Sequence, residues 1–518
     1  MRVETRHDLR HIVILLLIAG AIGVYLMLTM VLIANDGVEY IRFARRLTHD
    51  PANVISKYPA GYLMIIWFAH YVFALLGADA SNLSWATSAQ AATLLFRILS
   101  TIPLYYVGKS LVGGSKSFLA LLILGFLPYP ARFISDVMRD WPFVLFLFCG
   151  LCLLLRRDLH AHWRSFFWVG AAAGIAYIIR VEGLQLLVYG VLSLTVYLCR
   201  RRDRMMPAHA VSAFLLMAAG FAVTCGWYIG MKQERVPDKL REFIDAVRAH
   251  QDTETLPARD RIAGVGGLSR AEYVPDDFVK GELFRGFLKI LNRVSQNLLH
   301  FFAAPAVLGL YLHFRNRRYF AVPEFQAAGF MVVYIAMLLM LYHCYGYVSR
   351  RHVLPLTLMA LYYVPDGLLV LAHRIAALGR LAHVSRRKAV RTGLCFNVLL
   401  AAGIIACLPK LLDAGRSDKT PYRTVAAWLS ENTSPDQAVV SSDMRIPFYA
   451  DREGIPDEGP AYVPARAAFV VKVYGGRNET LLPLLANRCM EEVFSVGLRK
   501  NDADHRIVVY EVRLNPKP

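Results

Sequence analysis

The sequence predicts a polytopic α-helical membrane protein of about 11 transmembrane helices, with juxtamembrane helices and a small α/β domain at its C-terminal end. Hydrophobic residues make up 56% of the 518 residues and charged residues only 19%, whereas an average soluble domain has about 45–50% and about 25%. The apolar residues gather in runs of about 20, which suffice to cross a bilayer as a helix. After Pro409 the composition changes abruptly to mixed polar and apolar residues. These observations exclude a soluble globular enzyme.

The first apolar run, 11–34, is expected to remain as a transmembrane helix. It is longer than the apolar region of a signal peptide, and no small-residue cleavage site stands out after it. Later spans are recognised by their apolar length. They are 85–107, 117–134, 141–155, 165–180, 183–199, 210–230, 294–313, 327–345, 353–372 and 390–408.

The net charge of +19, from 58 Lys and Arg against 39 Asp and Glu, is distributed as in membrane proteins. Basic residues bunch in short links between apolar runs, as in 200–204, 315–318 and 386–388. Such clusters set the orientation of membrane proteins. We therefore expect membrane lipid, and no nucleic acid, as a partner.

The apolar run 59–77 decides which side of the membrane each later link faces. If it lies on the membrane surface, the Arg-rich links share the side of the basic N-terminus, as the positive-inside rule requires. If it crosses, they face the other side, and this alternative of an ordinary spanning helix stays open. The surface position predicts a cytoplasmic N-terminus and an extracytoplasmic side that holds links 35–84, 135–140 and 231–293.

We divide the chain into a transmembrane domain, 1–409, and an extracytoplasmic α/β domain, 410–518. In the second domain Thr420 and Pro421 are expected to open a helix that reaches Leu429, with Thr420 as its N-cap. Strand-like patterns follow at 438–441, 467–474 and 506–514.

Two acidic segments fall on the predicted extracytoplasmic side. Asp36 and Glu39 follow the first span and lead into an amphipathic helix, and Asp136 and Asp140 lie in link 135–140. Asp36 by itself fits a helix N-cap equally well. The functional interpretation depends on what else shares this side.

Four cations end on the same side, namely Lys57, Arg180, Arg350 and Arg351. Each alone is typical of an anchor among lipid headgroups. Together they form a candidate anion site facing the acidic segments. This combination suits group transfer from a lipid phosphate to a hydroxyl, because a base removes the acceptor proton while cations stabilise charge growing on the phosphate.

Several segments, taken in order, resemble the C-type glycosyltransferase superfamily, which uses polyprenyl-phosphate sugars. The likeness is to the bacterial lipid A aminoarabinose transferases and, more widely, to the protein O-mannosyltransferases. The segments that carry it are 36–45 with DGVEY, 56–62 with SKYPAGY, 140–143 with DWPF, 174–183 ending in RVEG, 349–356 with SRRHVLPL, and 422–450.

The resemblance implies an inverting enzyme that moves a sugar from a polyprenyl-phosphate carrier to an extracytoplasmic hydroxyl on a glycan, lipid or protein. It implies catalytic roles for Asp36, Asp140 and Glu39. The residues expected to bind the donor phosphate are Lys57, Arg180, Arg350 and Arg351, and those expected to line the cavity are Tyr58, Tyr62 and Asp136. A bacterial inner membrane with a periplasmic site is expected, and neither a cofactor nor a metal-binding pattern is found in the sequence.

The sequence leaves two alternatives open. One is a flippase or transporter for a lipid-linked sugar, which would more typically place charges at mid-bilayer and show repeated halves. The other is a ligase or polymerase of envelope glycans. The link 231–293, amphipathic at both ends, is expected to lie on the membrane and cover the lipid entrance.

Overall fold

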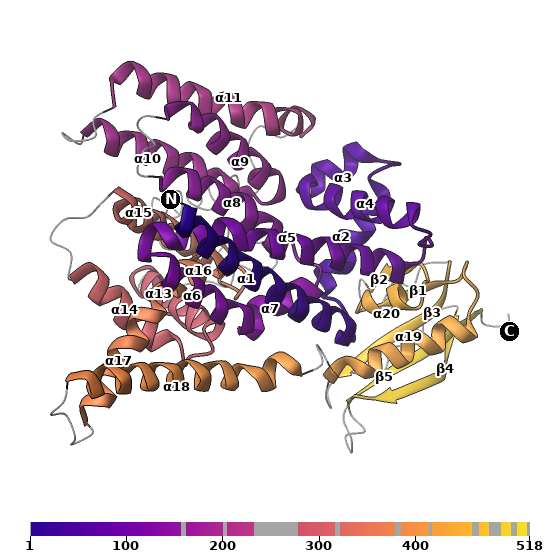
Figure 1. The fold of residues 1–518 in the computed structure, drawn as a ribbon. Helices are drawn as coiled ribbons and strands as arrows, with labels where there is room; N and C mark the ends of the chain where they lie inside the picture. Colours follow the sequence, from indigo (N-terminus) through magenta and orange to yellow (C-terminus); the bar gives the residue numbers. More distant parts are fainter. Residues whose placement is uncertain are drawn as a thin grey trace, which may run out of the picture.

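The computed structural model describes residues 2–156, 162–199, 205–232, 278–315, 322–378, 385–413, 417–457, 466–475, 488–498 and 505–514. Figure 1 shows a body of packed helices, with a sheet at one end that the chain reaches through the long α18. Most of the expected link 231–293 lies outside the described residues.

The helices follow one another closely along the chain. The first are α1 (Arg2–Thr29), α2 (Asn35–Arg46), α3 (Pro51–Lys57), α4 (Ala60–Leu75), α5 (Asn82–Val112), α6 (Gly114–Phe126), α7 (Pro128–Ser135), α8 (Asp140–Leu154), η1 (Trp163–Ser165), α9 (Phe166–Ile179), η2 (Val181–Leu184), α10 (Gln185–Cys199) and α11 (Pro207–Met231). The others are α13 (Phe278–Asn297), α14 (Ala303–Arg315), α15 (Val322–Tyr345), α16 (Leu354–Leu361), α17 (Val364–Leu378), α18 (Ser385–Leu412), η3 (Ser417–Lys419), α19 (Thr420–Asn432) and α20 (Arg445–Tyr449).

The chain is an integral membrane protein, and the predicted fold class is confirmed. Within the described ranges, 6 helices are long and apolar enough to cross a membrane, or up to 8 if each of two bent helix pairs is one span. The bends fall inside predicted spans, between α6 and α7 by 61° and between α16 and α17 by 46°. Apolar composition does not reveal such bends.

Three of the 11 predicted spans do not meet this length and hydropathy criterion, either as single helices or as bent pairs. Two of them are α8 and α9, with 15 and 14 residues, and such helices reach only about 21–23 Å. The third, 294–313, was wrong as a single helix. It begins in α13 and ends in α14, and the turn between them places Leu299 and His300 at positive φ.

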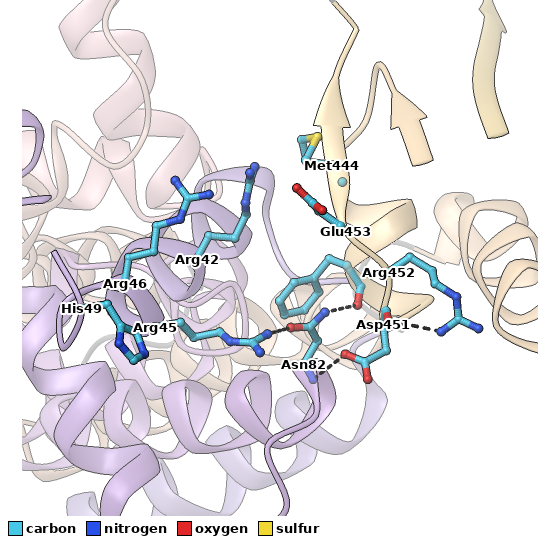
Figure 2. Close-up of a pocket in the computed structure, with 11 residues that line it drawn as sticks. Arg42, Arg45, Arg46, His49, Asn82, Met444, Asp451, Arg452 and Glu453 are labelled. Carbon is cyan, nitrogen blue, oxygen red and sulfur yellow. Dashed lines mark hydrogen bonds between the residues drawn. The ribbon is translucent and has the colours of Figure 1, made fainter. Parts of the chain in front are cut away.

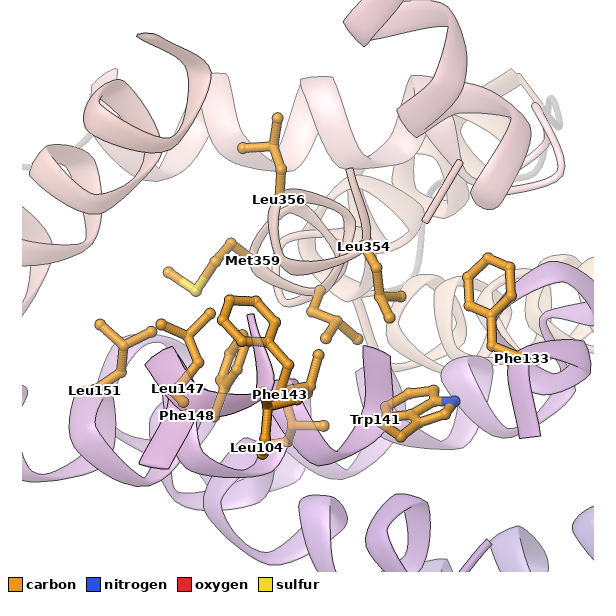
Figure 3. Close-up of a cluster of buried hydrophobic side chains, with 14 of the residues drawn as sticks. Leu104, Phe133, Trp141, Phe143, Leu147, Phe148, Leu151, Leu354, Leu356 and Met359 are labelled. Carbon is orange, nitrogen blue, oxygen red and sulfur yellow. The ribbon is translucent and has the colours of Figure 1, made fainter. Parts of the chain in front are cut away.

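A hydrophobic core joins the helices that carry the acidic and basic segments. Figure 3 shows Trp141 and Phe143 of α8 beside Leu354 of α16, with Leu104 of α5 and Phe133 of α7 in the same cluster. Each of these side chains is less than 9% exposed. This packing fixes the start of α8 next to the start of α16.

The packing of α9 on α11 depends on glycines at the contact. A Cβ at Gly170 would lie 1.9 Å from the carbonyl oxygen of Met217, and one at Gly220 would lie 2.0 Å from that of Phe167. Small residues let two membrane helices approach backbone to backbone. The contact holds α9, whose C-terminal end carries Arg180.

The C-terminal sheet has five strands in the order β2-β1-β3-β5-β4. The strands are β1 (Ala438–Ser441), β2 (Gly454–Pro456), β3 (Ala467–Gly475), β4 (Arg488–Gly497) and β5 (His505–Leu514). Strand β1 pairs in parallel with β2 and β3, and the remaining pairs are antiparallel. Val425 and Leu429 of α19 pack against the sheet. Thr420 is the first residue of α19, and Lys419 is its N-cap, so the predicted capping role of Thr420 was wrong.

The sheet end of the chain contacts the helical body at defined points. The backbone N–H of Ile33 donates to the Tyr449 hydroxyl at 3.1 Å. The side-chain amide of Asn82 donates to the Phe448 carbonyl at 3.0 Å. The helix α2, which follows Ile33, therefore lies between the body and α20.

Candidate functional site

Asp36 lies in the first turn of α2, and the N-cap of this helix is Ala34, so Asp36 does not cap it. The next residue, Gly37, permits a close contact with the turn between α7 and α8. A Cβ at Gly37 would lie 2.7 Å from the carbonyl oxygen of Asp136 and 3.0 Å from the Cβ of Val137. The two acidic segments predicted from the sequence therefore lie against each other.

Asp140 begins α8 and is only 2% exposed. Its carboxylate forms an ion pair and hydrogen bond with the guanidinium of Arg180. Arg180 leaves α9 in an extended conformation and leads into η2. The same guanidinium also binds the carboxylate of Glu182, with 3.1 Å between Nη2 and Oε1. Arg180 is thus buried between two carboxylates.

Arg351 lies in the link between α15 and α16 and joins the two acidic segments. Its Nη1 donates to Oδ2 of Asp36 at 2.7 Å and lies 3.0 Å from Sδ of Met138. Burial lowers the pKa of Arg351, but the carboxylates of Asp140 and Asp36 more than offset this, and the net effect is a raised pKa. Because the field of both carboxylates acts on one guanidinium, Asp36, Asp140, Arg180 and Arg351 form one site.

Three further predicted residues, Glu39, Tyr58 and Asp136, have contacts of their own. The Tyr58 hydroxyl donates to Oε2 of Glu39 at 3.5 Å. Burial and the Glu39 carboxylate raise the pKa of Tyr58. Asp136 is the C-cap residue of α7 and its charge acts on Arg445 in the sheet domain. The side chain of Lys57 lies outside the described part of the structure.

Two predicted residues have a different environment from the one expected. Tyr62 does not line a described cavity, because it is 1% exposed and its hydroxyl pairs with that of Thr93 at 2.8 Å. Its ring supports Tyr40 in an edge-on contact. The guanidinium of Arg350 lies 3.9 Å from the centre of the Tyr129 ring. It faces α7, whereas its neighbour Arg351 faces Asp36.

Two separate, mainly apolar cavities border α15. One, of about 170 Å³, is lined by Arg180, Glu182 and His352 beside the site and by Tyr334 and Leu338 of α15. The other, of about 400 Å³, is lined by an earlier part of α15 together with α8 and α10. Tyr334 and His352 were not predicted from the sequence. Nothing in the sequence distinguished Tyr334 from the other tyrosines of its span, and here its hydroxyl donates to the His352 carbonyl at 2.9 Å.

The arrangement brings carboxylates, guanidiniums and an apolar cavity together. Among the residues that the structure describes, no three His, Cys, Asp or Glu side chains are grouped to hold a metal ion. The described site therefore provides groups for proton transfer and for binding an anion, with an adjoining space that suits a lipid chain.

Comparisons with known proteins show the fold. No family model matches the sequence, and no curated protein matches it. The apo structure of ArnT from Cupriavidus metallidurans aligns with 98% of this chain and 98% of its own, at TM-score 0.59 and 14% identity. The same protein bound to undecaprenyl phosphate aligns at TM-score 0.55 and 15% identity, over 96% of this chain and 97% of its own. The oligosaccharyltransferase AglB from Archaeoglobus fulgidus, in complex with an inhibitory peptide and a dolichol-phosphate, aligns at TM-score 0.51 and 14% identity, over 91% and 70%.

Proposed function

We propose that this chain, which has the fold of the C-type membrane glycosyltransferases, transfers a sugar from a polyprenyl-phosphate carrier to an acceptor hydroxyl on the extracytoplasmic side of the membrane. The acceptor is a glycan, a lipid or a protein of the cell envelope. The solved structures of similar fold support the donor class, since one holds undecaprenyl phosphate and another a dolichol-phosphate. A bacterial inner membrane is the proposed location.

The observation that carries the proposal is the pair of Asp–Arg contacts beside an apolar cavity. Arg180 lies at the polar end of the cavity beside α15, and Arg351 reaches the other carboxylate, Asp36. A polyprenyl phosphate has a charged head and an apolar tail. We place its head between Arg180 and Arg351 and its tail along α15, because charged groups are best bound by partners of opposite charge away from water.

The proposed reaction is a single displacement at the anomeric carbon of the donor. Asp36 accepts the proton of the acceptor hydroxyl, and the acceptor oxygen forms a bond to the anomeric carbon. The bond from that carbon to the phosphate oxygen breaks, and its electron pair stays on the phosphate. Arg351 and Arg180 stabilise the added negative charge. Attack opposite to the leaving phosphate inverts the configuration of the sugar.

We assign different roles to the two aspartates because their surroundings differ. The Asp36 side chain is 46% exposed, while that of Asp140 is 3% exposed. A proton acceptor must reach the substrate, and Asp36 meets this condition. We therefore propose Asp140 and Glu182 as positioning residues that hold the Arg180 guanidinium, and Glu39 with Tyr58 as part of the wall beside Asp36.

The test is sugar transfer by the purified full chain in detergent, supplied with a radiolabelled polyprenyl-phosphate sugar and an extract of envelope lipids and glycans. We expect label to move into an acceptor and the free polyprenyl phosphate to appear in equal amount. A transporter would form no new glycosidic bond. Absence of transfer, together with label movement across vesicles that contain the protein, would overturn the proposal in favour of a transporter.

A further inference from the structure

A cationic cavity separate from the Asp–Arg site lies between α2 and the sheet domain. Its volume is about 600 Å³. Figure 2 shows the guanidiniums of Arg42 and Arg46 near each other on the α2 wall, with Glu453 on the opposite wall. The lining residues that carry side-chain charge or hydrogen-bonding groups are Arg42, Arg45, Arg46, His49, Asn82 and the segment 451–453.

Most polar groups of this cavity already have partners. Arg45 donates to the side-chain oxygen of Asn82. The backbone N–H of Asn82 donates to the carboxylate of Asp451 at 3.2 Å. Glu453 is paired with Arg466 at 3.0 Å. Arg452 donates to the carbonyl of Thr433 at 2.6 Å. The contact of Asn82 with Asp451 joins the two walls, and both carboxylates of the cavity have a partner.

Arg42 and Arg46 differ from these residues. Among the described residues, neither guanidinium has a partner in a hydrogen bond or an ion pair. Burial, and then the charge of Arg46, lowers the pKa of Arg42, and the nearby carboxylates of Glu39 and Glu453 offset this only in part. Two guanidiniums near each other over an open space, neither held by a direct ion pair, provide the forked donors that phosphate groups prefer.

The same helix connects these cations to the Asp–Arg site. Arg42 and Arg46 follow Glu39 at helical spacings of three and seven residues, so the three side chains share one face of α2. Asp36 lies six and ten residues before the two arginines, which is about 9–15 Å along a helix axis. Six and ten residues also turn the chain by about a third and a quarter of a turn away from alignment. A ligand held by Arg42 and Arg46 must therefore extend along α2 and partly around it to reach Asp36.

We propose that the cavity binds a phosphate group of the acceptor, at a distance of about two to three helical turns from the hydroxyl that receives the sugar. This inference rests on the proposed transferase function. The phosphate can belong to a soluble glycan or to a lipid headgroup, and the chemistry that Arg42 and Arg46 recognise is the same in both.

The first experiment measures binding of inorganic pyrophosphate by calorimetry to the full chain in an uncharged detergent, after the donor site has been saturated with polyprenyl phosphate. The double variant Arg42→Gln/Arg46→Gln should weaken binding by about tenfold or more, because two charge-assisted contacts are lost. Arg506→Gln is the matched control, since Arg506 lies on β5 outside the cavity. The affinity of the Arg506→Gln variant for pyrophosphate should equal that of the unmodified chain.

A second variant should increase the affinity for pyrophosphate, which a folding defect would not do. Glu453→Gln removes a negative charge from the cavity wall, so it should strengthen pyrophosphate binding. Equal affinity in the unmodified chain, the double arginine variant and Glu453→Gln would overturn the anion site.

A further comparison decides whether the bound phosphate belongs to a soluble glycan or to a lipid headgroup. Binding of glucose 6-phosphate is compared with binding of nanodiscs that contain or lack phosphatidic acid. Binding of the sugar phosphate assigns a glycan, and binding that requires phosphatidic acid assigns a lipid headgroup.

The acceptor role is tested by kinetics. In the double arginine variant the KM for the acceptor should rise about tenfold or more, while the KM for the donor stays the same. If pyrophosphate binding falls but the acceptor KM does not change, the acceptor assignment is overturned and the transferase function stands. If the unmodified chain transfers no sugar, the proposed function and the acceptor role fail together, and the binding result still decides the anion site.

Discussion

Replacing Asp36 with Asn removes a proton acceptor from the proposed site while keeping the size of the side chain. The amide oxygen of Asn can still accept the hydrogen bond that Arg351 donates to Oδ2 at 2.7 Å. General base catalysis contributes about 10²–10⁴-fold to a rate, which corresponds to about 3–5 kcal/mol of activation free energy. We therefore expect kcat to fall by this factor. The KM for the donor should stay the same or decrease, because Arg351 loses a competing carboxylate.

The assay is steady-state transfer of radiolabelled sugar by purified protein, with donor and acceptor varied in turn. Asp436→Asn is the matched control, since Asp436 is exposed in the loop before β1. It makes the same chemical change far from the proposed chemistry. A melting curve in detergent should show that both variants are folded, because neither aspartate is buried.

Two results would refute the assignment of Asp36. A kcat within about twofold of the unmodified chain would show that no proton transfer in the rate-limiting step depends on this carboxylate. A higher donor KM with an unchanged kcat would show that Asp36 only orients Arg351. Either result would make Glu39 the next candidate for the base.

Two further replacements test how the site is held together. Arg180→Gln leaves the buried carboxylate of Asp140 without its partner and should lower the free energy of unfolding by about 3–5 kcal/mol. The loss is measured as a fall in melting temperature. The double variant Arg180→Gln/Asp140→Asn should recover part of the lost stability. An unchanged melting temperature of the single variant would contradict the buried pair. Gly37→Ala places a Cβ against the turn between α7 and α8 and should cost about 1–3 kcal/mol and reduce transfer. Gly226→Ala, whose Cβ would meet nothing within 4 Å, is its control, and equal behaviour of the two variants would contradict the close contact.

The predicted site could be assembled from the sequence because its charges stand at the ends of apolar runs. Charged residues are rare within a membrane, so a carboxylate or guanidinium at a span end can be assigned to a side from the order of spans. The order of spans, with run 59–77 placed on the membrane surface by the positive-inside rule, assigns Asp36, Asp140, Arg180 and Arg351 to one face. The structure joins them in two ion pairs. Their catalytic and binding roles remain predictions.

The remaining features depended on local geometry that apolar composition does not encode. Hydropathy is the same for a straight helix and for one bent between α6 and α7, so it did not predict the bend. Arg350 and Arg351 are adjacent, and only the turn that they occupy decides that one faces Tyr129 and the other Asp36. Tyr62 belongs to a motif, yet its register on α4 turns it toward Thr93 in the core.

The two ion pairs of the site differ in their exposure to solvent, and this difference suggests separate roles for them in the proposed reaction. In the pair Arg180–Asp140 the side chains are 6% and 3% exposed, and in Arg351–Asp36 they are 31% and 46% exposed. A buried pair is costly to separate, and a more exposed pair costs less. The pair that opens at the lower cost is therefore the one that holds the proposed base. In the proposed reaction an entering phosphate takes Arg351 from Asp36, and the same step frees the carboxylate to accept the proton of the hydroxyl.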